Sequence, residues 1–378
     1  MIYLDYNATT PCDPEVVKAM LPYFTEKFGN AASKTHPYGW VADEAVSKAR
    51  KQIASLINAS ESEIIFTSGS TEGCNLVLKG VFELYTSKGK HIITCETEHK
   101  AVLDSCKHLE KMGAEISYLK VDKEGLINLS ELERTIRPDT VLIAIMYANN
   151  ETGVIQPIRE IGIIAKKHKL LFFSDSTQAI GKWKVDVVAD EIDLLAMSAH
   201  KFYGPKGIGA VYVRRKGPRA NLMAQIDGGG HERGFRSGTL NVTGIVGMGA
   251  AAAICEQQME TEAARLGALR NELEKGLLPL GKVHINGNIE TRMPHVSNLS
   301  FEGFSAERFI SLMNGEVAFS VGSACTSASK EPSHVLTAMG LSENSVKGSI
   351  RLSLGRFTTG KEIAQTIQIF TKTIEKIQ

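Results

Sequence analysis

The chain lacks an excess of charge of either sign. Its 378 residues carry 43 Lys and Arg against 42 Asp and Glu, which gives a formal net charge of +1. Like charges form neither a basic arm nor an acidic tail. Nucleic-acid binding draws much of its affinity from clustered cationic side chains, so we expect no direct nucleic-acid partner. Small-molecule chemistry is the better expectation.

The sequence also lacks paired cysteines and an apolar membrane span. Its six cysteines, at positions 12, 74, 95, 106, 255 and 325, contain no CxxC pair and no zinc-like spacing. They predict reduced thiols in a cytoplasmic protein without a resident metal. Residues 1–5 show no signal-peptide pattern. The longest uncharged stretch, 237–255, is rich in Gly, Ser, Thr and Asn, and we expect a buried or interface helix there and no membrane contact.

Strand-like and helix-like segments alternate from about residue 60. Short apolar, β-branched runs predict strands at 63–67, 91–94, 141–146, 170–173, 194–197 and 210–213. Segments of helical period begin at residues 71 and 101 and cover 157–168, and an amphipathic helix is expected over 38–58. This alternation predicts an α/β fold with a mostly parallel sheet that is covered on both faces.

The character of the sequence changes after Cys255. A long charged helix is predicted over 257–277, followed by shorter strands, such as 296–301, and further helices. We interpret this region as a smaller α+β domain. The expected division is a large domain at 15–255 and a small domain formed by 1–14 and 256–378.

Polar residues follow the predicted strands, where an open α/β sheet binds its ligand. Small residues at 67–73 open a helix and predict a phosphate cradle. The later strand ends carry His99, Asn150, Asp175 and Lys201. Each has an ordinary structural explanation by itself, such as a helix cap for Asp175 or a solvated surface lysine for Lys201. Their succession predicts a site for a phosphate-bearing cofactor.

A phosphate cradle, a carboxylate and a lysine together suit pyridoxal 5′-phosphate (PLP). This cofactor needs a lysine amine for its Schiff base, an acid for the pyridine nitrogen, and an aromatic or imidazole plane against its ring. An ordinary lysine, with a pKa of about 10.4, is almost wholly protonated at neutral pH. We therefore expect a neighbouring cation such as protonated His200, or partial desolvation, to help release the amine proton.

Distinctive motifs are spread over essentially the whole chain. The sequence SAHKFYGPKGIG stands at 198–209, and further motifs lie at 3–11, 97–100, 149–153, 175–178, 228–234, 236–239, 322–326 and 351–356. Together they resemble the cysteine desulfurases of the NifS/IscS kind, within the PLP-dependent class V aminotransferase superfamily. The resemblance implies a type I aminotransferase-like fold, with a mostly parallel seven-stranded sheet in the large domain.

The resemblance also implies roles for residues around the cofactor. Lys201 is the residue that binds PLP as a Schiff base, and His99 stacks on the pyridine ring and shuttles protons. Asp175 pairs with the ring nitrogen and Gln178 bonds the phenolic oxygen. The phosphate ligands implied are Ser70, Thr71, Ser198 and His200, together with Thr239 from the other subunit of a homodimer.

Asn150, also counted among the cofactor-binding residues, and Arg351 are similar to the family's substrate-carboxylate pair. An arginine suits this role because its planar guanidinium matches a carboxylate with two parallel hydrogen bonds.

Cys325 is separated from the other five cysteines by the same resemblance. It lies within 319–329, a run of small residues that packs no core firmly. The implied reaction converts L-cysteine to L-alanine and leaves a persulfide on Cys325. The implied acceptors are an iron–sulfur scaffold protein, a tRNA-thiolation carrier or a nitrogen-fixation pathway, and Cys325 can also ligate an iron–sulfur cluster transiently. The family gives Cys12 no role, and the other four are expected to be small buried thiols.

The sequence is compatible with two other enzymes. A selenocysteine lyase is the nearer one, and a class V aminotransferase or lyase would share Lys201, Asp175 and His99 but would have no use for Cys325. A binding module without catalysis is disfavoured because the lysine, the acid and the nucleophile are all intact. The glycine-rich segment 204–209 is not GxxxxGK[ST], so a nucleotide loop is disfavoured too.

Overall fold

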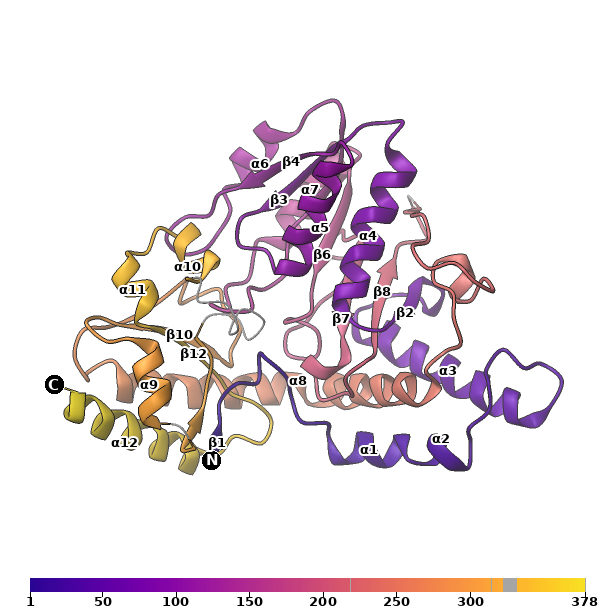
Figure 1. Cartoon of the computed structure of the whole chain (residues 1–378). Helices are drawn as coiled ribbons and strands as arrows, with labels where there is room; N and C mark the ends of the chain where they lie inside the picture. The colour runs from indigo at the N-terminus through magenta and orange to yellow at the C-terminus, as the bar shows by residue number, and fades with distance from the viewer. Residues whose placement is uncertain (218, 314, 322–331, 378) are drawn as a thin grey trace.

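The computed structural model describes residues 1–217, 219–313, 315–321 and 332–377. Its larger sheet has seven strands (Figure 1), in the order β2 (Ile64–Thr67), β8 (Gly209–Val213), β7 (Leu194–Ser198), β6 (Leu171–Asp175), β5 (Thr140–Ala144), β3 (His91–Cys95) and β4 (Glu115–Leu119). In direction, β8 alone opposes the other six strands of this sheet. The prediction of a mostly parallel seven-stranded sheet is therefore confirmed.

The edge strand β4 is the member that the sequence patterns missed. Its residues Glu115–Leu119 are mostly exposed or half-buried, and only Leu119 is buried. An edge strand needs no continuous apolar run, because one of its sides faces solvent. The remaining strands of the sheet agree with the predicted ones to within two residues at most ends.

Helices cover both faces of this sheet. On one face lie α4 (Ser70–Tyr85) and α5 (Lys100–Lys111), and on the other lie α3 (Pro37–Leu56) and α7 (Ile158–Lys167). Successive strand residues enter opposite cores, as Phe172 and Phe173 of β6 do. This alternation follows from the two-residue period of a strand, and burial on both faces explains the apolar runs in the sequence. The short α6 (Leu129–Thr135) lies beside β4 and α7.

A second core lies around a smaller sheet. This antiparallel sheet has the order β12 (Ser349–Ser353), β10 (Val296–Phe301), β9 (Val283–Ile285). It packs with α9 (Ala306–Met313) and α12 (Gly360–Ile377). Two shorter helices, α10 (His334–Ala338) and α11 (Glu343–Lys347), also belong to this region.

The N-terminal strand belongs with this second core. In β1 (Ile2–Tyr3) both residues pair in parallel with β11 (Val317–Ala318), and Leu4 is buried in the same core. The chain then passes to α1 (Pro14–Met20) and α2 (Pro22–Thr25). This pairing agrees with counting residues 1–14 in a small domain, although the full division into two domains stays a prediction.

The helix α8 (Val242–Leu277) corrects the segmentation expected after the large sheet. It is one continuous helix of 36 residues, whereas the sequence predicted a helix within 237–255 and a separate one from 257. Its first half packs in the large core through residues such as Ile245 and Cys255, and its second half packs in the small core through Leu266 and Leu273. The change of composition therefore marks a change of neighbours within one helix, and the predicted domain boundary falls inside it (Figure 1).

The expectation of a buried helix for 237–255 is confirmed from residue 242 onward. At Gly249 an added Cβ would lie 2.5 Å from the Cα of Ala49, so α8 and α3 approach each other closely. No helix in the described part of the chain is long and apolar enough to cross a membrane.

Candidate active site

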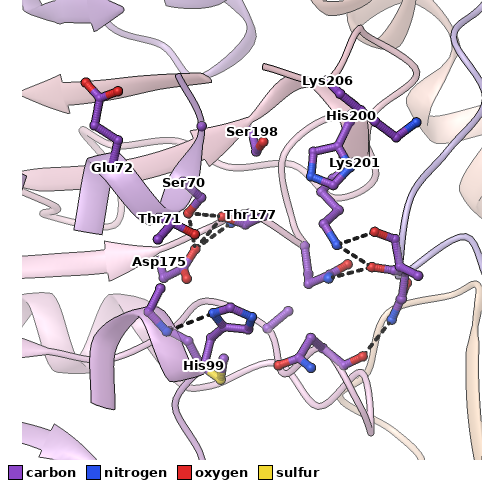
Figure 2. Close-up of a pocket in the computed structure, with 18 of the residues that line it drawn as sticks. Ser70, Thr71, Glu72, His99, Asp175, Thr177, Ser198, His200, Lys201 and Lys206 are labelled. Carbon is purple, nitrogen blue, oxygen red and sulfur yellow. Dashed lines mark hydrogen bonds between the residues drawn. The ribbon is translucent and has the colours of Figure 1, made fainter. Parts of the chain in front are cut away.

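A cavity of about 400 Å³ lies at the carboxyl ends of the parallel strands (Figure 2). It brings together most of the predicted site residues: Ser70, Thr71, His99, Asn150, Asp175, Gln178, Ser198, His200, Lys201 and Arg351. Thr239 is exposed and is not among the described residues that line the cavity. Its predicted role concerns a second subunit and stays a prediction. Cys325 lies outside the described residues.

The N-terminus of α4 lines the cavity and can bind an anion. The helix begins at Ser70 after Gly69, and no side chain caps it. At Gly209 an added Cβ would lie 2.6 Å from the Cα of Gly69, so only glycine allows β8 to approach this turn so closely. The uncapped N–H groups and the helix dipole favour a negative group, and the hydroxyl-bearing residues Ser70, Thr71 and Ser198 line the same space.

Asp175, at the end of β6, is 5% exposed and is held by neutral donors. Its Oδ1 accepts from the backbone N–H of Thr177 at 3.1 Å and lies 3.3 Å from Ser70 Oγ. The Thr177 hydroxyl lies 2.6 Å from Ser70 Oγ and contacts the same carboxylate. The weak Cys74 thiol donor lies 3.7 Å from Oδ2. This carboxylate can therefore accept a cationic ring N–H.

His99 is the N-cap residue of α5. Its Nδ1 accepts from the backbone N–H of Ala101 at 3.1 Å. A neutral His99 ring therefore carries its proton on Nε2. In Figure 2 the ring lies across the cavity from Ser198 and His200. An imidazole fixed in this way at the edge of the cavity can stack on a planar ligand and can hold a proton at Nε2.

Lys201 ends the short helix η2 (Ala199–Lys201), directly after β7. Its Nζ donates to the backbone oxygens of Asn7 at 2.6 Å and Ala8 at 2.8 Å. Gln178 Nε2 donates to the same Asn7 oxygen at 3.1 Å. The buried Gln178 Oε1 has no hydrogen-bond partner among the described residues. An unsatisfied polar atom in the lining of a cavity indicates a polar ligand.

His200 corrects one expectation about Lys201. Burial, with the nearby charges of Lys201, Lys206 and Lys182, lowers the pKa of His200 from 6.5 to about 4. Its ring is therefore neutral at pH 7, and its Nδ1 lies 3.1 Å from Thr9 Oγ1. The prediction that a protonated His200 supplies the neighbouring cation is wrong, because desolvation and the surrounding lysines remove its proton. A neutral imidazole N–H can still donate to a phosphate oxygen.

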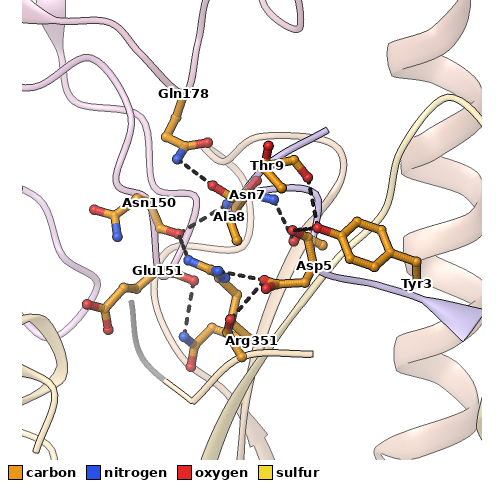
Figure 3. Close-up of polar contacts among 12 residues, drawn as sticks. Tyr3, Asp5, Asn7, Ala8, Thr9, Asn150, Glu151, Gln178 and Arg351 are labelled. Carbon is orange, nitrogen blue, oxygen red and sulfur yellow. Dashed lines mark hydrogen bonds and ion pairs between the residues drawn. The ribbon is translucent and has the colours of Figure 1, made fainter. Parts of the chain in front are cut away.

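The opposite side of the cavity is made by the N-terminal segment and β12 (Figure 3). Arg351 is 1% exposed; its Nη2 lies 2.7 Å from Asp5 Oδ1, and its Nη1 donates to the Asn150 backbone oxygen at 2.8 Å. The Nε of Arg351 is buried without a partner among the described residues. Asn7 joins the same centre, because its Nδ2 donates to the Asn150 oxygen at 3.1 Å. Such a buried cation suits a substrate carboxylate.

The sequence missed several residues of the site. Asn7 and Asp5 lie in a segment that the resemblance includes without giving it a role, and nothing local predicts that β1 and β12 would bring it to the cavity. The other lining residues without a predicted role are Ala8, Ser68, Gly69, Glu72, Ala101, Met146, Ala148, Thr177, Lys206 and Gly207. A signal existed for Ser68, Gly69 and Thr177, because they belong to the strand-end segments already singled out.

The described cysteines other than Cys12 confirm the expectation of buried thiols. Burial raises the pKa of Cys95, Cys106 and Cys255 to about 12, and it raises that of Cys74 as well. Such thiols are poor nucleophiles at neutral pH. Cys12 is half-buried, and burial together with Asp13 raises its pKa too. In the described part of the chain, no group of three or more His, Cys, Asp or Glu side chains is placed to hold a metal ion.

Known proteins resemble this chain over its full length. Residues 2–366 match the family Aminotransferase class-V. The chain is 53% identical over 378 residues to the cysteine desulfurase IscS of Anaeromyxobacter dehalogenans (strain 2CP-C), covering all of this chain and 93% of that protein. It is 52% identical over 377 residues to the cysteine desulfurase IscS of Neisseria meningitidis serogroup C, with the same coverage of both.

Solved structures also resemble this chain over nearly its full length. A NifS-like protein superposes with a TM-score of 0.93 at 37% identity and 99% coverage of both chains. SspA in complex with cysteine superposes with a TM-score of 0.85 at 38% identity, covering 95% of this chain and 100% of that one. The chain belongs to the class V aminotransferases. Within that family it groups with the cysteine desulfurases of the IscS kind, which depend on PLP.

The predictions of the family, the fold, the enzyme class and the cofactor are thereby confirmed. The two alternatives kept open by the sequence, a selenocysteine lyase and a simple aminotransferase, are not favoured by these relatives. The donor set also suits PLP: an uncapped helix for an anion, a buried carboxylate, a lysine, and an unsatisfied amide oxygen, all around one cavity.

Proposed function

We propose that this chain converts L-cysteine to L-alanine in the cavity and passes the sulfur on as a persulfide of Cys325. The observation that carries the proposal is the meeting of Lys201, Asp175 and His99 around one cavity, each from a different strand end. The membership in the cysteine desulfurases supplies the substrate class. One solved relative is described as a complex with cysteine, which supports the same substrate here.

In this proposal the cofactor would be held mainly by residues at the strand ends. Asp175 would accept the pyridine N–H, His99 would lie against the ring, Gln178 would bond the phenolic oxygen, and Lys201 would provide the amine for the covalent link. The phosphate would be bound at the start of α4 by Ser70 and Thr71, by Ser198 and His200, and by Thr239 of the partner subunit. When bound, PLP supplies an electron sink for the breaking bonds of the substrate.

The chain's own residues then bind the substrate and move its protons. Arg351 and Asn150 hold the carboxylate of L-cysteine, a role supported by the unsatisfied Nε of the buried Arg351. The Lys201 amine accepts the proton from the substrate's Cα. The burial of Asn150, Asp175 and Arg351 keeps bulk water from these side chains and strengthens each charge interaction.

Sulfur leaves through Cys325. Its thiolate attacks the substrate sulfur, the carbon–sulfur bond breaks, and the electron pair of that bond stays with the carbon fragment. Protons return to this fragment, which leaves as alanine, while the sulfur remains on Cys325 as a persulfide. The balance is one L-cysteine and one thiol giving one alanine and one persulfide, with no external oxidant or reductant.

A product assay with the purified enzyme and L-cysteine tests the proposal. We expect alanine and, with a reducing thiol, sulfide in equal amounts. Cys325→Ala should keep the visible absorbance of bound PLP and lose sulfide release, whereas the matched control Cys12→Ala should stay active. Borohydride reduction should place the cofactor adduct on Lys201. Full desulfurase activity of Cys325→Ala, or an adduct on another residue, contradicts the proposal.

We also propose that the enzyme is a homodimer. Large apolar side chains are exposed together along α1, α2 and the start of α3: Val17, Leu21, Phe24, Phe28, Tyr38, Trp40 and Val41. An exposed apolar group of this size typically marks a protein interface. Sedimentation analysis should give twice the chain mass of 41.1 kDa, and Phe24→Asp with Phe28→Asp should shift the enzyme toward monomer. An unchanged mass distribution in that double variant would place the interface elsewhere.

The acceptor and the compartment complete the proposal. We propose an iron–sulfur scaffold protein or a tRNA-thiolation carrier as the acceptor, and the cytoplasm as the compartment. The five described cysteines are all unpaired thiols, which supports a reducing environment. Transfer of radiolabelled sulfur from L-[35S]cysteine to each candidate acceptor distinguishes them.

A further inference from the structure

A second lysine lies buried behind the active site. Lys182, in the segment between β6 and β7, is only 8% exposed, and none of the described carboxylates forms an ion pair with it. Its Nζ lies 3.3 Å from Nε2 of His295, which is 1% exposed. A buried lysine without a carboxylate partner is costly in its charged form. The mechanism proposed above gives neither residue a role.

The contact between His295 and Asn7 fixes where the imidazole proton sits. Asn7 Nδ2 donates to the Asn150 oxygen, so the Asn7 Oδ1 is the atom that lies 2.9 Å from His295 Nε2. Two acceptors at this distance would repel, and therefore Nε2 carries the proton and donates to Oδ1. A charged Lys182 has only N–H donors to offer, so it would repel the N–H at His295 Nε2. A neutral Lys182 instead presents a lone pair to it.

Protonation of Lys182 therefore disturbs the hydrogen bond from His295 Nε2 to Asn7 Oδ1. To accept from a charged Lys182, His295 would have to move its proton to Nδ1, which is buried without a partner among the described residues. That tautomer leaves an unsatisfied donor at Nδ1 and an acceptor facing the Asn7 oxygen. The three side chains thus have two competing arrangements, and one proton decides between them.

Asn7 connects this cluster to the catalytic lysine. The backbone oxygen of Asn7 accepts from Gln178 Nε2 at 3.1 Å (Figure 3). The same oxygen accepts from Lys201 Nζ at 2.6 Å. The side chain of the same residue contacts His295. A change at Lys182 can therefore reach Lys201 in two ways, by the direct repulsion of like charges and by the position of the Asn7 carbonyl.

We propose that Lys182 is a positioning residue for Lys201: by binding or releasing one proton it sets how readily Lys201 gives up its own. When Lys182 is charged, repulsion makes Lys201 release its proton more easily. When Lys182 is neutral, Lys201 holds its proton more firmly. The effect on the Lys201 proton is independent of the proposed function, and only its consequence for catalysis rests on the proposed role of Lys201.

Lys182 binds and releases its proton near neutral pH. Burial, followed by the charge of Lys201, lowers the pKa of Lys182 to about 7, with a smaller effect of Arg351 and an opposing one of Cys255. The other groups near Lys182 keep one charge state around that pH. The pKa of His200 is lowered to about 4, burial lowers that of His295 well below 6.5, and burial raises that of Cys255 to about 12. Glu262 of α8 lines the same small space beside Lys182.

Competitive acetylation of the full-length chain without PLP tests the inference. Acetic anhydride reacts only with an unprotonated amine, and mass spectrometry reports the rate at Lys201 itself. In the wild type, the logarithm of this rate should rise with pH, flatten around pH 7 as Lys182 becomes neutral, and rise again. Extrapolated to the same pH, the low-pH limb should give a rate roughly tenfold higher than the high-pH limb. This is the size of effect expected for two interacting titratable groups.

Lys182→Met should convert this profile into a single rising line. Below pH 7 its Lys201 should react roughly tenfold more slowly than in the wild type, and above about pH 8.5 the two proteins should agree. Lys182→Arg, with a fixed charge, should follow the faster limb throughout. The exposed Lys184→Met, two residues along the chain, is the matched control and should keep the wild-type profile.

Three results overturn the inference. One is a wild-type profile without flattening, and another is a Lys182→Met profile that keeps it. The third is a Lys182→Met rate reduced by the same factor at every pH, which is what a merely structural role predicts. If one variant does not fold, as judged by circular dichroism, the other decides alone. The assay uses neither PLP nor L-cysteine, so its failure leaves the proposed desulfurase function untouched.

Discussion

The two sides of the cavity are built in different ways. One side, the strand-end wall, consists of Ser70, Thr71, His99, Asp175 and Ser198, each at or just beyond the end of a strand of the large sheet. The other side, the terminal wall, consists of Asn7, Ala8 and Arg351. The ion pair that supports the terminal wall joins Arg351 to Asp5 across 346 positions of the chain.

This difference teaches how each wall depends on the rest of the fold. A residue of the strand-end wall is placed by the strand that precedes it, so a polar substitution there changes chemistry more than stability. A residue of the terminal wall is placed by the pairing of β1 with β11 and by the fit of β12 beside the N-terminal segment. A substitution in the terminal wall should change stability and binding together.

The largest expected effect lies in the strand-end wall, at Asp175→Asn. The amide keeps the shape and the hydrogen bond from Thr177, but it removes the charge that would stabilise a protonated ring nitrogen. We expect turnover to fall on the order of a thousandfold, by analogy with the loss of one preorganised electrostatic group. The free energy of unfolding should change by about 1 kcal/mol or less. Steady-state kinetics and urea titration measure both.

Asp104→Asn on the exposed face of α5 is the control for this variant, because Asp104 is paired with the exposed Lys107 at the surface. Turnover of Asp175→Asn within tenfold of the wild type would show that this carboxylate does not serve the chemistry.

The next effect lies in the terminal wall, at Arg351→Met. The substitution leaves the Asp5 carboxylate, whose side chain is only 16% exposed, without its partner. We expect a loss of about 3 kcal/mol in the free energy of unfolding, the lower end of the range for breaking a buried ion pair. The KM for L-cysteine should rise as well.

Adding Asp5→Asn to Arg351→Met separates the two consequences. The double variant should recover part of the stability, because no unpaired charge remains, but its KM should stay high. Recovery of KM in the double variant would mean that Arg351 supports the wall without binding the substrate carboxylate.

A smaller effect concerns pH, at His200. In the unfolded chain this histidine binds a proton below its ordinary pKa of 6.5, whereas in the folded chain burial and neighbouring lysines lower the pKa to about 4. Between these values the unfolded state binds more protons, so His200 reduces stability as the pH falls from 6.5 to about 4. Because the side chain is partly exposed, we expect about 1 kcal/mol after solvent screening.

Urea unfolding of the chain without PLP, at pH values on both sides of this window, measures the slope. Between these pH values, the free energy of unfolding of His200→Gln should fall by about 1 kcal/mol less than that of the wild type. The exposed His108→Gln in α5 should behave as the wild type. Equal slopes for all three proteins would mean that His200 is protonated in the folded chain at the same pH as in the unfolded one.

Local sequence patterns predicted the strand-end wall because each of its residues stands next to a strong strand signal. The same patterns missed β4, whose half-exposed residues give no apolar run, and they divided α8 where its composition changes. They also suggested a protonated His200. The charge state of a histidine depends on burial and on lysines from several elements, and these are known only after the chain has folded.

The sequence by itself determined the α/β class, the succession of polar strand ends, and the family through its motifs, because all of these are written in residues that are neighbours along the chain. Only the tertiary structure decided that Asn7 would receive the Lys201 amine, that Arg351 would be buried against Asp5, and that Lys182 and His295 would stand behind them. These contacts join segments far apart in the sequence, and their charge states follow from the water that folding excludes around them.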